Sequence, residues 1–404
     1  MTSDELRSDP TQPLPGPPEP WAETDMPSLR DAPPWHMTEM IEAEPALAER
    51  LLTRLADPSS AAGALAEQIR ATAFRRASIV VTGCGTSEHG AQASTEILRD
   101  AMRTARLPWR LGEGGAPVAA QAFEASLDDE LGAGGLVIGI SHEGATWATN
   151  LALERARSSG AAVGLVTVSE RSPAAQRADV IVATGELDQS WCHTIGYLAP
   201  ILAATAVGAH LSGRPIDPAA IRDVLAAGLR ADAIAAVERL AAALAPLERI
   251  IVIGSGVDRI AARELALKLE EGTHIPAAAR DLETLLHGHL AGMDGRTGLV
   301  LIAADAANAE SRRSRAAGAL RAAAAIGCPT GVIAGPAYRD AFEDTQLIGT
   351  PNVETAGLPR AVAALVSTAV PVQLLAERIA RIRGVNPDPI RRDDPAYLRA
   401  AEAP

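Results

Sequence analysis

The sequence predicts an α/β fold in which mostly parallel sheets are covered by helices on both faces. Short β-branched runs, such as 78–82 (SIVVT) and 249–253 (RIIVI), alternate with longer segments of helical periodicity. This alternation occurs twice along the chain, which indicates a diverged internal duplication. The length of 404 residues also exceeds what one hydrophobic core usually supports. We therefore expect two domains, each with its own sheet.

The elements of the first half are predicted from hydrophobic period and from the residues that end each run. Apolar residues at helical spacing predict two helices before the first strand, and each strand is a short apolar run bounded by glycine or polar residues. We expect helices at 38–56, 61–77, 87–102, 146–159 and 194–210. We expect strands at 78–82, 136–140, 163–168 and 180–183.

The second half repeats this pattern after a helical region at 218–245. Strands are expected at 249–253, 299–303 and 331–334, and helices at 259–272, 308–326 and 359–383. The predicted organisation is a Pro-rich N-terminal arm (1–37), N-terminal helices (38–77), a first domain (78–213), linking helices (214–246), a second domain (247–383) and a C-terminal tail (384–404).

The composition argues against several classes of function. With 47% hydrophobic and 22% charged residues, the chain can bury a substantial core. The net charge is −13 and no basic run is interleaved with aromatic residues, so we expect no nucleic-acid binding. Cys84, Cys192 and Cys328 are widely spaced and odd in number, which argues against a disulfide framework and a zinc knuckle. The histidines are scattered, so we expect neither a metal nor a cofactor.

No membrane segment is expected from the apolar runs. The runs 198–207 and 361–372 are shorter than the roughly 18 to 20 residues that a bilayer requires. The first ten residues, MTSDELRSDP, carry acidic residues and proline where a secretory signal has basic charge and then an apolar run. We therefore expect a cytoplasmic protein.

The loop after the first predicted strand has features of a ligand site. Ligands of open parallel sheets bind beyond the carboxyl ends of the strands. The loop Gly83-Cys84-Gly85-Thr86-Ser87 has two glycines that let amides approach a ligand, and two hydroxyls at a helix N-terminus. A phosphate or a polyol would suit it, and an ordinary tight turn with an N-cap is the alternative. A nucleotide site is disfavoured, because the Walker lysine and the third glycine of the dinucleotide fingerprint are missing.

The loop after the 136–140 strand (SHEGAT) is rich in polar residues and precedes a helix. Taken together, the two loops resemble those of the SIS (sugar isomerase) family of phosphosugar-binding domains, over roughly residues 76–385. The family is best known from the isomerase half of glucosamine-6-phosphate synthase, and the resemblance implies two flavodoxin-like SIS domains. The residues expected to contact the substrate are Cys84, Gly85, Thr86, Ser87, Ser141, His142, Glu143, Thr146, Trp191 and His193.

The strongest local signal lies on the predicted helix at 259–272. Glu264, Lys268 and Glu271 share one face at 100° per residue, with apolar residues on both sides, and a second polar strip lies elsewhere on the helix. Two polar strips suggest that one of them is enclosed. A carboxylate near a lysine in an enclosed pocket is what proton abstraction next to a carbonyl requires. A solvated salt-bridge face is the alternative interpretation.

The stretch ALKLEEGTHIPAAARDLETLLHGHLA also resembles the catalytic stretch of the synthase isomerase domain. By that resemblance, Glu271 is the base that moves a proton between adjacent sugar carbons through an enediol. His287 helps to open the sugar ring and reaches the site of the partner subunit. Glu264 and Lys268 orient hydroxyls and stabilise developing charge. The resemblance therefore implies a homodimer with a shared active site.

The sequence departs from the family pattern near the sugar. Glu143 stands where the family usually has serine, and a carboxylate beside a phosphate dianion costs binding energy. Trp191 and His193 replace small side chains in the substrate loop. One interpretation is that these three residues bind a different ligand, whose end at this position carries no phosphate. The alternative is that Trp191 belongs to the core and His193 is a capped surface residue.

Two further departures concern nitrogen chemistry. No lysine follows Lys268, so an imine mechanism through the C-terminal tail is unsupported. The first cysteine is Cys84, so no N-terminal glutaminase cysteine is present and we do not expect a glutamine amidotransferase.

Three functions remain open at this point. The first is an aldose/ketose isomerase or deaminase that acts on a sugar, an amino sugar or a sugar phosphate by proton transfer through Glu271. The second is a fructosamine-type deglycase that uses the same base. The third is a non-catalytic regulatory protein that binds a carbohydrate derivative.

Overall fold

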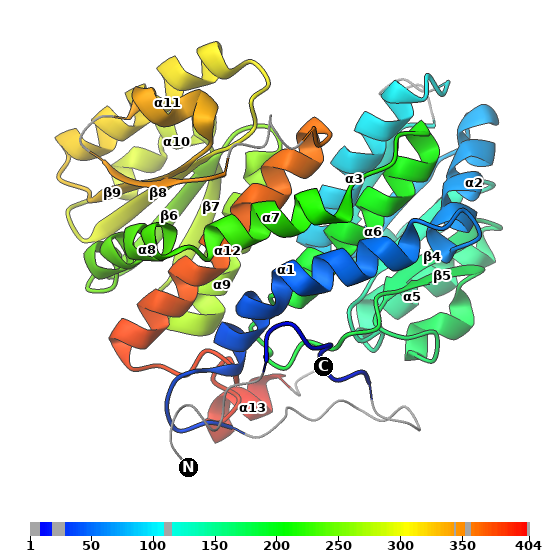
Figure 1. Cartoon of the computed structure of the whole chain (residues 1–404), viewed down its shortest axis with the longest axis horizontal. Helices are drawn as coiled ribbons and strands as arrows, with labels where there is room; N and C mark the ends of the chain where they lie inside the picture. The colour runs from blue at the N-terminus through cyan, green and yellow to red at the C-terminus, as the bar shows by residue number, and fades with distance from the viewer. Residues whose placement is uncertain (1–8, 18–28, 109–114, 343–344, 352–356, 402–404) are drawn as a thin grey trace.

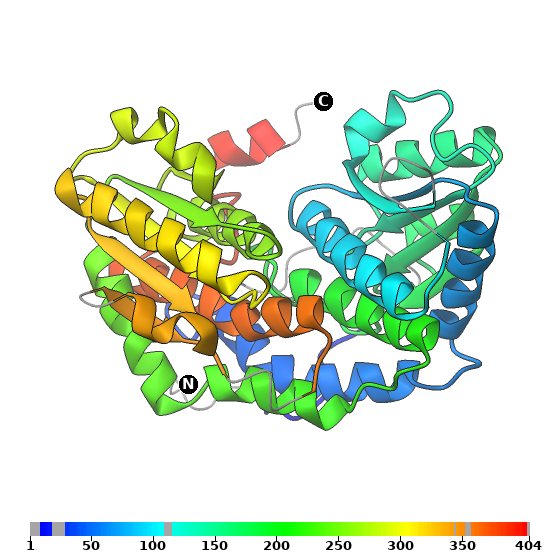
Figure 2. The same ribbon diagram turned by 90° about the horizontal axis from the view of Figure 1, so that it is seen from above.

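The structure is a computed structural model that describes residues 9–17, 29–108, 115–342, 345–351 and 357–401. Two five-stranded sheets form two lobes that lie side by side (Figures 1 and 2). Every strand pairing in both sheets is parallel, which confirms the predicted α/β class. Parts of the predicted N-terminal arm and C-terminal tail lie outside the described residues.

The strand orders of the two sheets match. The first sheet contains β1 (Ile79–Gly83), β2 (Pro117–Gln121), β3 (Leu136–Ile140), β4 (Ala162–Thr167) and β5 (Val180–Ala183), in the order β2-β1-β3-β4-β5. The second contains β6 (Arg249–Gly254), β7 (Ala277–Asp281), β8 (Thr297–Ala303), β9 (Thr330–Ala334) and β10 (Gln346–Gly349), in the order β10-β9-β8-β6-β7. Taken from its other edge, the second sheet has the order of the first, which is the flavodoxin-like order.

Helices surround both sheets and connect the lobes (Figure 2). The first lobe and its approach contain α1 (His36–Leu55), α2 (Ala61–Phe74), α3 (Thr86–Thr104), α4 (Ala122–Ser126), α5 (Trp147–Ser158) and α6 (Ile195–Ser212). The remainder of the chain contains α7 (Pro218–Gly228), α8 (Ala231–Leu244), α9 (Asp258–Thr273), α10 (Leu282–Leu286), α11 (Ala309–Ala325), α12 (Arg360–Arg383) and α13 (Pro395–Ala401).

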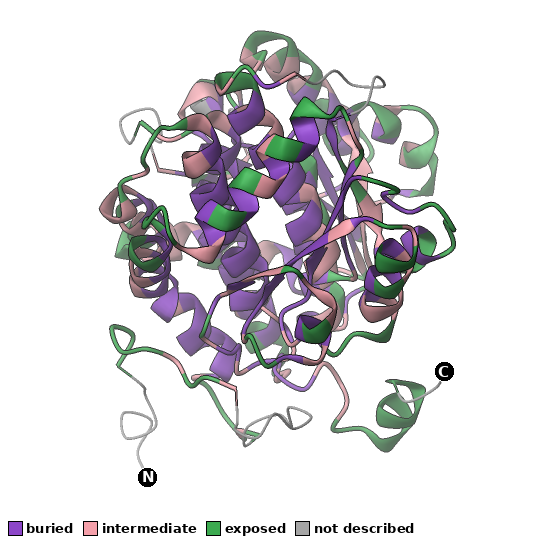
Figure 3. Cartoon of the chain, turned by 90° about the vertical axis from the view of Figure 1, so that its right-hand side faces the viewer, coloured by how far each residue is buried: buried purple, intermediate pink, exposed green. Residues whose placement is uncertain are grey.

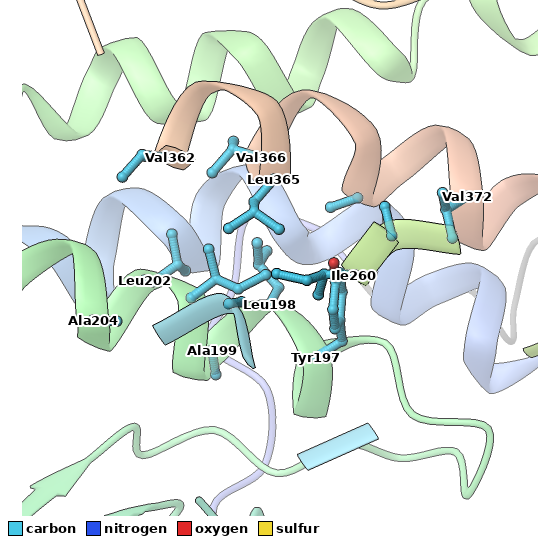
Figure 4. Packing of buried hydrophobic residues seen from close by; sticks show 14 of the residues in the cluster. Tyr197, Leu198, Ala199, Leu202, Ala204, Ile260, Val362, Leu365, Val366 and Val372 are labelled. Atoms are coloured by element: carbon cyan, nitrogen blue, oxygen red, sulfur yellow. The ribbon is translucent and has the colours of Figure 1, made fainter. Parts of the chain in front are cut away.

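One hydrophobic core runs through both lobes. Its buried members include Val81 of the first sheet and Ile250 of the second. In Figure 4, Leu198 and Leu202 of α6 lie beside Leu365 of α12 in this core. Buried residues fill the interior and exposed residues lie at the periphery (Figure 3). Because the core is continuous, the lobes hold a fixed spacing across which side chains can meet.

Helices α6 and α12 are long and apolar enough to cross a membrane by length and composition. The expectation that no apolar segment reaches that length is therefore wrong. However, 83% of the apolar window in α6 and 94% of that in α12 are buried inside the fold. Their composition is accounted for by this burial, since a helix that is apolar on all sides is typical of a protein core.

The sequence did not predict the edge strands β2, β7 and β10. The first two have the sequences PVAAQ and AAARD, which are rich in alanine and poor in β-branched residues. Each of the three pairs with one neighbour only. Such a strand is formed by its pairing with the sheet, so its own residues carry a weak signal.

The C-terminal tail is tied to the start of α1 and to the first lobe. The Asp388 carboxylate accepts hydrogen bonds from the backbone N–H groups of His36 and Met37, both at 2.9 Å. These are the first residues of α1, whose N–H groups have no partner within the helix. The N–H of Trp191 donates to the carbonyl oxygen of Asp388 at 3.0 Å. The tail therefore anchors the loop that contains Trp191 against α1.

Candidate functional site

A tight turn places the N-terminus of α3 at the end of β1. A Cβ at Gly83 would lie 2.5 Å from the carbonyl oxygen of Ser87, so the turn requires glycine there. Gly85 has a φ of +56°, a region that favours glycine. The turn leaves Cys84 partly exposed and buries Thr86 in the first turn of α3. This geometry brings the Thr86 hydroxyl toward the second lobe.

Lys268 of α9 is enclosed, and its ammonium group lies near three oxygens. Its side chain is 0% exposed, as is that of Glu264. Nζ lies 2.6 Å from Glu271 Oε2, 3.0 Å from Thr86 Oγ1 and 3.5 Å from Glu264 Oε1. An ammonium group has three N–H donors, so the three oxygens match its hydrogen-bonding capacity. The predicted face of α9 is therefore enclosed, and a solvated salt-bridge face is excluded.

Lys268 is also the only lysine in the chain, whose other Lys+Arg positions are all arginine. Arginine presents a planar fork of donors, which does not fit three oxygens arranged around one point. The three oxygens belong to α9 itself and to α3 of the first lobe. A compact ammonium group thus joins the two lobes at this position.

His89 is a member of this cluster that the sequence reasoning missed. Its Nδ1 lies 2.7 Å from Glu264 Oε2, and its side chain is only 12% exposed. Helical spacing could have identified it, because His89 lies three residues after Thr86 and thus on the same face of α3. Glu264 is therefore held by one cation and one imidazole, from different lobes.

The two carboxylates beside Lys268 have pKa values that are shifted in opposite directions. Burial alone would raise the pKa of Glu264, but Lys268 and His89 outweigh it and hold that pKa below its usual range. Burial raises the pKa of Glu271, even though Lys268 opposes the shift. Burial disfavours the ammonium form of Lys268, yet the two glutamates raise its pKa above the usual range. The Glu264 carboxylate therefore stays ionised, whereas the Glu271 carboxylate binds a proton more readily than usual.

A second group of predicted residues lies beside this cluster. The N–H of Asp188 donates to Nε2 of His142 at 2.9 Å, so the neutral ring carries its proton on Nδ1. The rings of His142 and His193 are 5.3 Å apart between centroids. Burial, with His193 next, lowers the pKa of His142 to about 4. Burial, followed by the charge of Lys268, lowers the pKa of His193 to about 3. Both rings are therefore neutral at pH 7.

Asp188 was not predicted, and it shapes the loop that carries His193. Its carboxylate accepts hydrogen bonds from the N–H groups of Ser190, Thr194 and Gly196, at 3.1, 2.7 and 3.1 Å. These bonds fold the loop so that His193 lies near Lys268, and the positive charge of Lys268 helps to lower the pKa of His193. No periodicity marks such a residue in the sequence, because its partners are backbone groups.

Trp191 is half-buried and stacks with the C-terminal tail. The guanidinium carbon of Arg392 lies 4.6 Å from the centroid of the Trp191 ring. His193 is also half-buried. The alternative of a core tryptophan and a capped surface histidine does not fit these positions.

The remaining substrate-contact candidates lie around the carboxyl ends of β1 and β3. Burial raises the pKa of the Cys84 thiol, so it is protonated at neutral pH. Ser141 is buried, Glu143 is half-buried beside His142, and Thr146 is exposed at the N-cap of α5.

His287 is not brought to the Lys268 cluster within one chain. It is exposed and pairs with Glu283 on its own helix, with Nε2 and Oε1 2.7 Å apart. His289 is exposed as well, and its Nδ1 lies 3.4 Å from Nε of Arg280. A role of His287 in the cluster thus needs a second chain or a rearrangement.

We predict that Lys268→Met lowers the free energy of unfolding by about 3 to 5 kcal/mol at pH 8, because two largely buried carboxylates lose their cation. Without Lys268 the folded-state pKa of both glutamates rises above the unfolded value of about 4.5. Stability of the variant then falls as pH rises above that value, so the deficit is smaller at pH 5. Urea unfolding at both pH values measures this difference.

Two substitutions serve as controls for this prediction. Arg263→Met removes an exposed cation from the same helix and should change stability by roughly 0.5 kcal/mol or less. Lys268→Arg keeps the charge and should not restore wild-type stability, because its fork does not match the three oxygens. Equal stability of Lys268→Met and Arg263→Met at pH 8 would contradict the proposed pairing.

Comparison with known proteins identifies the same fold and a matching domain in the second lobe. The SIS domain family model matches residues 243–375. A curated glutamine–fructose-6-phosphate aminotransferase (isomerizing) from Symbiobacterium thermophilum is 30% identical over 271 residues, which are 63% of this chain and 42% of that protein. Its counterpart from Zymomonas mobilis is 24% identical over 323 residues, which are 77% of this chain and 50% of that protein. The chain spans about half the length of the curated relatives it matches.

Solved structures agree along most of the chain. The C-terminal domain of glucosamine-fructose-6-phosphate aminotransferase from Francisella tularensis has a TM-score of 0.72 at 20% identity, over 89% of this chain and 99% of that one. A tagatose-6-phosphate ketose/aldose isomerase from Escherichia coli has a TM-score of 0.65 at 20% identity, over 89% and 97%. These likenesses establish the fold, and residues 243–375 match the SIS domain family model.

Proposed function

We propose that this protein is an aldose/ketose isomerase or deaminase that moves a proton between adjacent carbons of a sugar, an amino sugar or a sugar phosphate in the cytoplasm. Glu271 acts as the base. Lys268 and Glu264 hold the reacting hydroxyls and stabilise the charge that develops on the enediol. Neither a metal nor a cofactor enters this scheme.

The observation that carries the proposal is the opposite shift of two carboxylate pKa values around one buried ammonium. A catalytic base works best when its pKa lies near the working pH, and burial moves Glu271 in that direction. Glu264 stays ionised and is tied to His89 and Lys268, so it is suited to orientation rather than proton transfer. Lys268 remains positive and can stabilise an enediolate oxygen.

The names of similar proteins support sugar chemistry. They include the E. coli isomerase above and a glucosamine-6-phosphate deaminase from Thermotoga maritima, which has a TM-score of 0.59 at 16% identity over 82% of this chain and 97% of that one. Within the described residues, the buried hydroxyls Ser141 Oγ and Thr194 Oγ1 have no hydrogen-bond partner. A polyol hydroxyl both donates and accepts hydrogen bonds, as such a buried group requires.

Glu143 and the neutral histidines favour a substrate whose distal end is not a phosphate dianion. A fructosamine-type deglycase is therefore a second candidate, with Glu143 holding an amine-bearing end. In that reaction, Glu271 would take the same proton before the amine leaves. A protein that only binds a carbohydrate derivative is the third candidate, and turnover measurements separate it from the first two.

We predict that Glu271→Gln lowers kcat by roughly 10² to 10⁴, because the amide cannot accept the proton. The assay incubates fructose, glucosamine and their 6-phosphates with the protein in D₂O and follows deuterium incorporation at the carbons beside the carbonyl. Glu270→Gln is the matched control, since Glu270 is the exposed neighbour on the same helix. Equal exchange by the Glu271 and Glu270 variants would rule out the assigned base.

We predict that Glu143→Ser strengthens the binding of sugar phosphates relative to unphosphorylated sugars, because it removes a negative charge from the proposed ligand end. Thermal-shift titrations with each phosphorylated and unphosphorylated pair measure this change, since a ligand of the native state raises Tm by mass action. Glu170→Ser, at an exposed position after β4, is the control. If wild type and Glu143→Ser prefer the same sugar phosphates equally, Glu143 does not set specificity.

We further propose a homodimer in which His287 of each chain completes the site of the other. The exposed position of His287, away from Glu271 in its own chain, supports this arrangement. Mixing inactive Glu271→Gln and His287→Ala proteins should restore up to about one quarter of wild-type activity, because half of randomly paired dimers then hold one intact site of two. Mixtures that stay inactive, although mass spectrometry shows mixed dimers, would disprove a shared site.

A further inference from the structure

The second lobe has kept the loop that corresponds to the candidate sugar loop. A Cβ at Gly254 would lie 2.6 Å from the carbonyl oxygen of Asp258, the same constraint that Gly83 shows in the first lobe. Gly256 has a φ of +63°, close to the +56° of Gly85. The loop Gly254-Ser255-Gly256 therefore makes the same strand-to-helix turn, at an edge where ligands of such sheets bind.

The second lobe cannot hold a sugar in the same manner, because its own carboxylate takes the ligand-facing amides. Asp258 accepts hydrogen bonds from the N–H groups of Ala304 and Asp305, both at 3.0 Å. Ala304 follows β8 as Ser141 follows β3 in the first lobe. An internal carboxyl group thus closes the position beside β8, and any ligand of this lobe must lie on the other side of the turn.

A cavity lies on that other side. It measures about 250 Å³ and opens between the first turns of α9 and α11. Its lining residues are Gly254, Ser255, Gly256, Arg259, Asp281, Leu282, Glu283, Ser311, Arg312 and Arg315. A second cavity of about 370 Å³ shares Gly256 and Arg259 with it and adds Arg99 and Arg263. The two adjoining cavities, here called the arginine groove, are lined by five arginines.

These five arginines lie close together in a chain whose net charge is −13. Three carboxylates, from Asp281, Glu283 and Glu96, also line the groove, so the arginines outnumber them. Arg259 pairs with Asp281 at 3.4 Å, with both side chains about half exposed, and such pairs contribute little to stability. Arg315 pairs with Glu283 at 2.5 Å, again with both side chains about half exposed. A phosphate, which accepts two parallel N–H bonds, can therefore replace these exposed carboxylates at little cost.

The most buried guanidinium of the groove is held in place by the turn itself. Arg312 is 18% exposed and lies 2.8 Å from Asp305. A Cβ at Gly256 would lie 2.3 Å from its Nη2, so glycine at this position is what allows Arg312 to lie against the turn. The groove therefore has one fixed cation at its base and exposed, adjustable cations at its rim.

We propose that the arginine groove binds a small molecule that carries phosphate, at a site separate from the Lys268 cluster. This proposal is independent of the proposed function, because none of the groove residues belongs to the candidate sugar site. Bidentate contacts from Arg259 and Arg315 hold the phosphate groups, and Ser255 and Ser311 supply hydroxyls beside them. The bound molecule bridges the N-terminal ends of α9 and α11.

Isothermal titration of the full chain with inorganic pyrophosphate tests the proposal, at fixed ionic strength maintained with sodium chloride. The double variant Arg259→Gln/Arg315→Gln should bind at least about tenfold more weakly, since it loses two charge-assisted contacts. Arg321→Gln, an exposed arginine of α11 outside the groove, should stay within about twofold of wild type. Inorganic phosphate, in parallel, should bind the same site more weakly than pyrophosphate.

A second pair of variants keeps the test decisive if the double variant fails to fold. Ser311→Glu places a negative charge in the groove, and Ser87→Glu places one at the first-lobe sugar loop. The proposal requires that only Ser311→Glu abolishes pyrophosphate binding. Loss of binding with Ser87→Glu alone would place the anion at the sugar loop. Absence of binding by wild type, or equal weakening by Arg321→Gln, would overturn the proposal.

Discussion

The arrangement of this site depends on one buried ammonium group. Lys268 is the only lysine of the chain, and its Nζ meets oxygens of Thr86, Glu264 and Glu271. Burying a single charge is costly unless it is paired and fully hydrogen-bonded, and here the number of acceptors equals the number of donors. Because Thr86 belongs to the first lobe and the glutamates to the second, this cation requires that both lobes keep their spacing. The continuous core around α6 and α12 maintains that spacing.

Two lobes with the same strand order carry different ligand-facing edges in this chain. Both lobes make the same turn with the same pair of glycines, but the buried polar residue at the start of the following helix differs in position and in consequence. In the first lobe the turn buries Thr86, which reaches Lys268. In the second lobe it buries Asp258, whose carboxylate takes the amides after β8, and burial raises the pKa of Asp258 to about 8. A difference of a few residues around the same turn thus gives the two lobes different electrostatics.

Sequence periodicity predicted which residues share a face of one helix or strand. It did not predict which side chains of distant elements contact each other. The shared face of Glu264, Lys268 and Glu271 follows from helical spacing, and the parallel sheets follow from alternating strands and helices. The alanine-rich edge strands carry no such pattern, because their pairing with a neighbour forms them. The contact of His89 with Glu264 depends on how α3 crosses α9. Asp188 acts on backbone groups of its own loop, which side-chain patterns do not reveal.

The protonation state of Lys268 tests this account most directly. Because the chain has one lysine, protein labelled with ¹⁵N-lysine gives a single Nζ resonance by NMR, and its chemical shift distinguishes ammonium from amine. The account predicts that this resonance keeps its ammonium shift through the ordinary lysine pKa of about 10.5, since Glu264 and Glu271 raise the pKa. Titration at or below that pH would show that burial outweighs the two carboxylates, and the paired, enclosed ammonium on which the site is built would be contradicted.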